Sequence, residues 1–133
     1  PFTRLISVYK YSYKSSGNQP SFSDFIYRVL SIVESKSYFL WNEEIQPNHL
    51  APLHLYTHDS DGNPIDFIGK MENFDSDLSS AFELIGIELN KPIAVNNKTI
   101  QASLEDIKKY YTPELKKIVY FAYKKDFELL GYS

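Results

Sequence analysis

The segment PFTRLISVYKY, residues 1–11, sets the pattern for the fold because it predicts a helix that begins at or near residue 1. A proline at the first helical position loses no N–H that the helix needs. Leu5, Ile6 and Tyr9 follow the 3.6-residue spacing of a buried helical stripe. Arg4 and Ser7 are three residues apart, so they share one face of this helix.

Working outward, the Ser-, Gly-, Asn- and Pro-containing segment 14–20 predicts a loop, and a second helix should follow. Ser21 or Ser23 would cap this helix, and its apolar spacing continues to about Lys36. Residues 38–64 contain three prolines and a polar turn, which predicts irregular structure. This irregular segment contains all three histidines of the chain, His49, His54 and His58.

The rest of the chain predicts one short strand and three helices. The alternating residues 65–69 predict the strand, and a helix should follow over about 75–84 with Leu78, Ala81, Phe82 and Ile85 inward. Residues 88–102 predict a loop. Helices should then cover 104–110 and the stretch from Thr112 to Gly131, with Thr112 as the cap. Because one strand cannot make a sheet, its partners are expected upstream of residue 1.

Composition limits the class of protein. The chain has 133 residues, of which 43% are hydrophobic and 23% charged, which is typical of a single globular domain. A net charge of −3 argues against general nucleic-acid binding. The absence of cysteine excludes disulfides and Cys-based zinc sites. There is no run of 18 apolar residues that would predict a membrane span.

Four segments, in order, resemble those of a known enzyme family. Residues 1–9 are similar to the second half of the pattern R-x-P-x-x-R-x-x-S-x-Y, and residues 48–52 resemble N-x-H-W-x-P with Leu50 in place of Trp. Residues 65–74, IDFIGKMENF, resemble YDFIGKFENL closely, and residues 110–132 are similar to the closing helix of the same family. That family is the carbohydrate sulfotransferases, sulfotransferase family 2 of the chondroitin/dermatan and HNK-1 types, and the likeness is to their C-terminal part.

The resemblance implies a fold class and a reaction. The fold would be the α/β, P-loop-like sulfotransferase fold, with residues 1–133 as a single domain or as the C-terminal, mostly helical part of one. The implied donor is 3′-phosphoadenylyl sulfate (PAPS), used without a metal, and the implied acceptor is a carbohydrate hydroxyl. Arg4 and Ser7 would contact the 3′-phosphate of PAPS, and Lys98 would approach its phosphates. None of the five glycines opens a phosphate loop, so the loop for the 5′-phosphosulfate is expected upstream.

His49 is the candidate general base, because a group that titrates near neutral pH can take the proton of the acceptor hydroxyl. The structural alternative is a histidine that caps its loop by hydrogen bonding. Arg4 also has an alternative role, an ion pair with Glu72. His54 and His58 have i, i+4 spacing, but the prolines argue against a helix and hence against a metal site. The turn 59–63 lacks the spacing of an EF-hand and predicts a plain turn.

A second hypothesis belongs to another class: a non-catalytic helical interaction domain, or a sulfotransferase relic that has lost its site. No nucleic-acid partner is expected, the predicted segments include no membrane anchor, and the sequence does not indicate an oligomeric state. The absence of cysteine favours a bacterial cytoplasmic protein, whereas a eukaryotic one would be expected on the lumenal side of the Golgi membrane.

Overall fold

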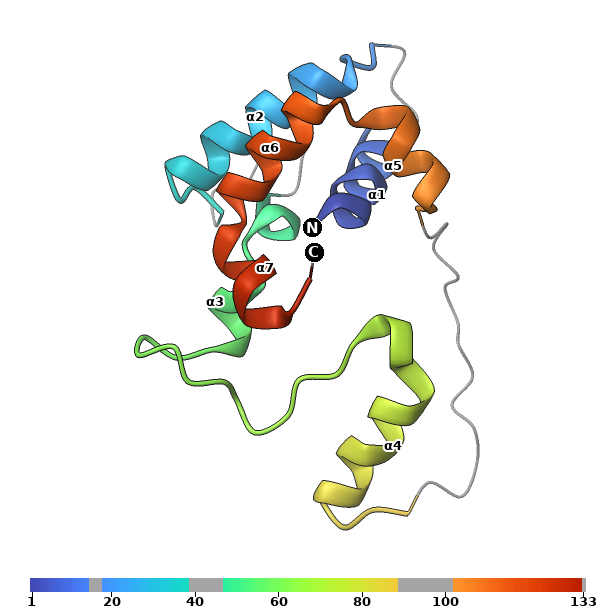
Figure 1. The fold of residues 1–133 in the computed structure, drawn as a ribbon, viewed down its shortest axis with the longest axis vertical. Coiled ribbons are helices and arrows are strands. Elements are labelled where there is room, and N and C mark those ends of the chain that lie inside the picture. Colours follow the sequence, from blue (N-terminus) through green and yellow to red (C-terminus); the bar gives the residue numbers. More distant parts are fainter. Residues whose placement is uncertain (15–17, 39–46, 89–101, 133) are drawn as a thin grey trace. The chain divides into compact units, whose positions relative to one another are not determined.

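The computed structural model describes residues 1–14, 18–38, 47–88 and 102–132, and these residues are mostly helical (Figure 1). They contain no β-strand, only an isolated antiparallel bridge between His58 and Pro64. The chain divides into two compact units, residues 1–54 with 99–133, and residues 55–98. No helix in the described ranges has the length and apolar character needed to cross a bilayer.

The first unit is built on α1 (Phe2–Ser12) and α2 (Phe22–Glu34). The first prediction is confirmed: α1 begins next to Pro1 and buries Leu5, Ile6 and Tyr9. Ser21 is the cap of α2, because its hydroxyl accepts the backbone N–H of Asp24 at 3.1 Å. Helices α5 (Leu104–Tyr110) and α6 (Pro113–Ala122) begin with the side-chain caps Ser103 and Thr112.

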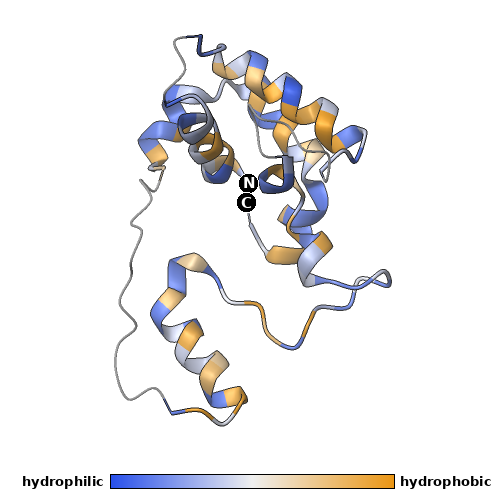
Figure 2. Ribbon diagram, turned by 180° about the vertical axis from the view of Figure 1, so that it is seen from behind, coloured by the Kyte–Doolittle hydropathy of each residue, from blue (hydrophilic) through white to orange (hydrophobic). Residues whose placement is uncertain are grey.

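Helix α6 packs along α2, and α5 packs against α1 (Figure 1). Figure 2 shows apolar residues recurring along α2 and α6, as the helical spacing requires. Phe22 lies at the centre of an aromatic cluster, with its ring centroid 5.2 Å from that of Tyr9 and 4.9 Å from that of Tyr111. Both pairs have edge-to-face geometry, the favoured arrangement for aromatic rings. The fully buried side chains around them are Leu5, Ile6, Phe25, Ile26, Leu50, Val29, Val119 and Tyr123.

The predicted single closing helix is wrong in one respect, because it is broken at Tyr123. Helix α6 ends at Ala122, and α7 (Lys124–Leu130) follows after one non-helical residue, Tyr123, with φ −113° and ψ 25°. The helix ends at Gly131, as predicted, in the left-handed conformation with φ 66°. Position 123 has no proline or glycine, and the apolar spacing continues without interruption from α6 into α7. The sequence therefore does not reveal the break.

The predicted strand at residues 65–69 is also wrong. The N–H of Ile65 binds the carbonyl of Thr57 at 2.9 Å next to the single bridge, and the chain then continues without further ladder bonds. An alternating sequence becomes a strand only when a neighbouring strand takes its N–H and C=O groups. The described residues provide no neighbouring strand beyond the bridge at His58 and Pro64. The prediction of a mostly helical chain is therefore confirmed, and the prediction of a strand is wrong.

Segment 38–64 has no long regular element among its described residues, but the argument against a helix at His54 is wrong. A 3₁₀ turn, η1, covers Pro47–Leu50, and a four-residue helix, α3, covers His54–Thr57. The prolines do not prevent α3, because Pro52 precedes its first residue by two positions and therefore removes no helical hydrogen bond.

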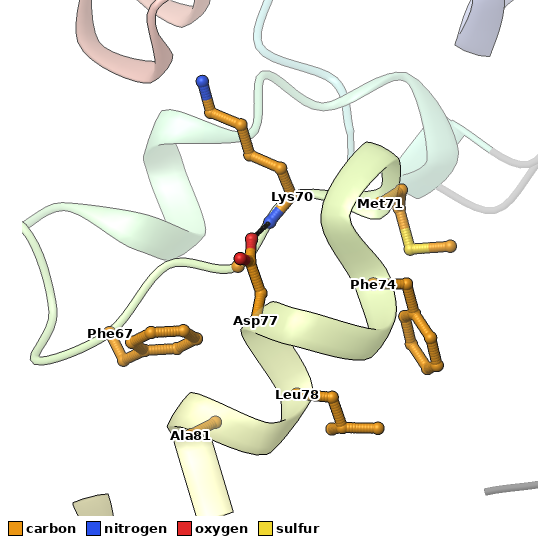
Figure 3. Close-up of a pocket in the computed structure, with 8 residues that line it drawn as sticks. Phe67, Lys70, Met71, Phe74, Asp77, Leu78 and Ala81 are labelled. Carbon is orange, nitrogen blue, oxygen red and sulfur yellow. Dashed lines mark hydrogen bonds between the residues drawn. The ribbon is translucent and has the colours of Figure 1, made fainter. Parts of the chain in front are cut away.

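The second unit contains the 3₁₀ turn η2 (Met71–Asn73) and α4 (Phe74–Leu84). Its segment before α4 is held by Asp77, whose carboxylate accepts the backbone N–H of Lys70 at 2.7 Å (Figure 3). A carboxylate in that position would repel a phosphate, so this N–H is no anion ligand. The residues predicted to lie inward on α4 are not buried within the unit, and Ile85, just beyond it, is 67% exposed. Two of them, Leu78 and Ala81, line a shallow apolar pocket together with Phe67 and Phe74 (Figure 3).

The pairing of α1 with α5 leads to a prediction on acid stability. Lys10 Nζ lies 2.8 Å from Asp106 Oδ1, and the hydrogen bond from Lys10, with a second from the Ser103 N–H, lowers the pKa of Asp106 to about 2. The unfolded value is about 3.9. A depressed folded pKa stabilises the fold above the unfolded pKa, and that contribution is lost as the pH falls through the folded pKa.

We therefore expect Asp106→Asn to be less stable than the wild type at pH 6, with the difference shrinking as the pH falls from about 4 towards 2. Urea unfolding at a series of pH values measures this. The neighbouring exposed Glu105→Gln is the control and should follow the wild-type curve. A difference between Asp106→Asn and the wild type that persists unchanged to pH 2.5 would contradict the prediction.

Candidate functional site

The two residues predicted to contact a phosphate, Arg4 and Ser7, both lie on α1 in the first unit. Ser7 is half-buried, and its hydroxyl donates to the carbonyl of Thr3, one turn earlier, at 3.1 Å. This back-bond within the helix is weak and leaves the hydroxyl free to rotate towards another acceptor. Ser7 therefore remains an available donor on the face that it shares with Arg4.

Arg4 is the least satisfied polar side chain in the described part of the chain. Its Nε and Nη2 atoms are buried and have no hydrogen-bond partner there. Its guanidinium carbon lies 5.4 Å from the ring centroid of Tyr123, a cation–π contact. The predicted partner Glu72 belongs to the second unit, so the Arg4–Glu72 ion pair stays a prediction. Buried N–H groups without an acceptor are costly, and a planar guanidinium suits the oxygens of a phosphate.

His49, the predicted base, lies in the 3₁₀ turn η1 of the same unit, and its side chain is exposed. The next residue, Leu50, is fully buried. The hydroxyl of Tyr123 donates to the Leu50 carbonyl at 2.7 Å. His49 is thus an exposed imidazole attached to an anchored backbone, as a proton acceptor for an external substrate should be.

Asp126 on α7 is a buried carboxylate with an exposed fraction of 0%. Its oxygens accept the backbone N–H of Leu53 at 2.7 Å and that of His54 at 2.9 Å. The ring Nδ1 of His54 also lies 2.7 Å from Asp126 Oδ1. Three hydrogen bonds of this length compensate the burial of the carboxylate and hold the first residues of α3.

Two tyrosines of this region keep their protons over the physiological pH range. Burial raises the pKa of Tyr123, and the nearby Arg4 opposes this effect. Burial also raises the pKa of Tyr38, with a smaller contribution from the charge of Asp126. Tyr123 is therefore a phenol that donates its hydrogen bond, which is the role that the Leu50 carbonyl requires.

Lys98 and the histidines His54 and His58 are the remaining candidates from the sequence. Lys98 lies outside the described residues. The ring Nδ1 of His58 contacts the hydroxyl of Thr57 at 2.9 Å, and within the described ranges no three His, Asp or Glu side chains gather as metal ligands would. The plain turn predicted at 59–63 is confirmed: Asp59 Oδ1 accepts the backbone N–H groups of Asp61 and Asn63 at 2.9 and 2.8 Å.

Comparison with known proteins bears on the whole chain. The model of a family described as "Sulfotransferase family" matches residues 1–133. The chain belongs to the sulfotransferase family. No curated protein and no solved structure matches it. Membership supports sulfotransfer as the class of activity and confirms the family resemblance of the four segments at that level.

Within this sulfotransferase domain, the sequence predictions missed Tyr123 and Asp126 as parts of the candidate site. Tyr123 looked like one more apolar position in the stripe of the closing helix. Asp126 carried a usable signal, because it lies next to Phe127 and three residues after Tyr123, on the inward face of an otherwise apolar pattern. An acidic residue at such a position is seldom fully buried unless it is paired.

Proposed function

We propose that this protein transfers a sulfuryl group from PAPS to a hydroxyl group of a carbohydrate. The observation that carries the proposal is Arg4, a half-buried arginine whose buried Nε and Nη2 atoms have no hydrogen-bond partner in the described residues, in a chain of the sulfotransferase family. A 3′-phosphate would supply the missing acceptors with matching planar geometry and opposite charge. Ser7, on the same face of α1, would add a neutral donor once its hydroxyl turns away from Thr3.

The roles of the residues follow from their chemistry. Arg4 and Ser7 would hold the 3′-phosphate of the nucleotide, and the approach of Lys98 to the phosphates of PAPS stays a prediction. PAPS supplies an activated sulfur–oxygen bond. His49 accepts the proton of the acceptor hydroxyl while the hydroxyl oxygen bonds to sulfur, and the sulfur–oxygen bond to the 5′-phosphate breaks with its electron pair on the nucleotide. The exposed imidazole of His49 suits an acceptor that arrives from solution.

The acceptor class rests on the resemblance of the four segments to carbohydrate sulfotransferases of the chondroitin/dermatan and HNK-1 types. The α/β, P-loop-like fold belongs to the same proposal. Exposed tyrosines such as Tyr56, at 51% exposure in the second unit, are compatible with contacts to sugar rings.

The test is transfer of labelled sulfate from PAPS by the full-length gene product to a panel of glycans, with His49→Gln as the inactive variant. We expect labelled product on at least one glycan and loss of label with the variant. A wild-type protein that binds adenosine 3′,5′-bisphosphate but labels nothing in the panel would contradict a carbohydrate acceptor. One that neither binds the nucleotide nor transfers sulfate would instead fit a non-catalytic interaction domain or a relic.

A further inference from the structure

Tyr123 has an unusual place in the first unit, since it is the single residue between two helices. Its backbone is non-helical, although its N–H still donates to the Val119 carbonyl and its carbonyl accepts from the Phe127 N–H, and its side chain is only 1% exposed. From this position the side chain contacts two distant segments of the chain. Those two segments carry Arg4 and His49, the residues with the central roles in the proposed reaction.

The first contact of Tyr123 is made by its hydroxyl. It donates to the Leu50 carbonyl at 2.7 Å across 73 residues of sequence, and both groups are buried. A buried carbonyl has no water to replace a lost donor, so this hydrogen bond should restrain the backbone at Leu50 strongly. Leu50 directly follows His49 in η1, so the restraint acts on the backbone that carries the imidazole.

The second contact of Tyr123 is made by its ring, which the Arg4 guanidinium faces at 5.4 Å. The two contacts use different parts of one rigid side chain, which has only two rotatable bonds. Arg4 on α1 and His49 on η1 are therefore placed relative to each other through one phenol.

Asp126, three residues further on, extends this restraint along the segment. It accepts the N–H groups of Leu53 and His54, so the segment 50–54 is held at its first carbonyl by Tyr123 and at its end by Asp126. The His49 side chain remains exposed while the backbone after it is held at both ends.

We propose that Tyr123 is a positioning residue that sets His49 relative to the nucleotide-binding Arg4. This inference rests on the proposed function, because it assigns a catalytic consequence to the hydrogen bond at Leu50. General base catalysis depends on the distance between base and hydroxyl, and a misplacement of about 1 Å can cost about a hundredfold in rate. An aromatic residue that only filled the core would need its ring and not its hydroxyl.

The test compares three variants of the full-length protein. Tyr123→Phe removes the hydroxyl and keeps the ring, and Tyr123→Leu removes both. Tyr120→Phe makes the same chemical change three residues earlier on α6, where the side chain is 38% exposed. Each variant is measured for kcat and KM with PAPS, for its Kd for adenosine 3′,5′-bisphosphate, and for hydrogen exchange of the amides of residues 51, 53 and 54.

For Tyr123→Phe we expect kcat to fall by about tenfold or more, because His49 loses its fixed position. The Kd for the bisphosphate should stay within about twofold, because the ring beneath Arg4 remains. Exchange of the three amides should become faster, which reports the loosened segment directly. Tyr123→Leu should in addition weaken nucleotide binding, and Tyr120→Phe should match the wild type in every measurement.

Two results would overturn the inference. If Tyr123→Phe keeps the wild-type kcat, the hydroxyl does not position the base, whatever the exchange data show. If Tyr123→Phe loses nucleotide affinity as strongly as Tyr123→Leu, the residue acts through general stability rather than through His49. A wild-type protein without sulfotransfer would defeat the proposed function and the catalytic part of this inference together, while the exchange data would still decide whether Tyr123 anchors the segment.

Discussion

Replacing Asp126 with alanine should lower the free energy of unfolding by about 3 kcal/mol or more, because it leaves buried donors without an acceptor. The backbone N–H groups of Leu53 and His54 lose their partner, as does the His54 ring. Water cannot readily replace a carboxylate at a site with 0% exposure. Urea denaturation monitored by circular dichroism measures the change.

Two further variants make this result specific to the Asp126 carboxylate. Asp126→Asn keeps one carbonyl oxygen as an acceptor and should lose less than the alanine variant. Glu128→Ala changes an exposed carboxylate on the same helix, whose partner Lys124 lies 3.6 Å away, and it should cost less than about 1 kcal/mol. If Asp126→Ala and Glu128→Ala were equally stable, the three hydrogen bonds of Asp126 would not support the fold.

Replacing Arg4 with alanine should weaken binding of adenosine 3′,5′-bisphosphate by roughly tenfold to a hundredfold. A hydrogen bond to a charged group contributes about 1.5–3 kcal/mol, and about 1.4 kcal/mol corresponds to a factor of ten in affinity. The unpartnered Nε and Nη2 atoms are the donors that the phosphate would gain. Isothermal titration calorimetry on the full-length protein gives the two dissociation constants.

The controls for the Arg4 variant separate charge from geometry. Arg4→Lys keeps the positive charge and loses the planar fork, so its affinity should lie between the wild type and the alanine variant. Lys124→Ala removes an exposed cation on α7 and should bind like the wild type. Unchanged affinity in Arg4→Ala would show that this arginine does not contact the nucleotide, and would remove the main support for the proposed donor site.

Local signals in the sequence predicted most of the helices. The apolar spacing of α1 and α2 and the caps Ser21 and Thr112 located the starts of three helices almost to the residue. These signals depend on neighbours three or four positions apart, which are visible in a single sequence. The strand predicted at residues 65–69 failed because a strand also requires a partner, and alternation says nothing about where that partner is.

The candidate site was less accessible to prediction. Arg4, Ser7 and His49 were found through the resemblance of short segments to a family, and the match over residues 1–133 confirms that family. No pattern indicated that the carbonyl of Leu50 would need the hydroxyl of Tyr123, since 73 residues separate them. Contacts of this kind depend on how helices pack, and packing is decided by the whole core rather than by any one segment.

The sequence by itself predicted where most of the longer helices begin and indicated the family of this protein, including the helix of residues 1–11 that carries Arg4 and Ser7. Only the tertiary structure decided that this helix faces Tyr123, that the closing helix breaks there, and that Asp126 is buried against residues 53–54. The physical reason is one of range. Spacing and capping act within one or two turns, whereas a buried phenol and a buried carboxylate persist only where distant backbone groups satisfy their hydrogen bonds.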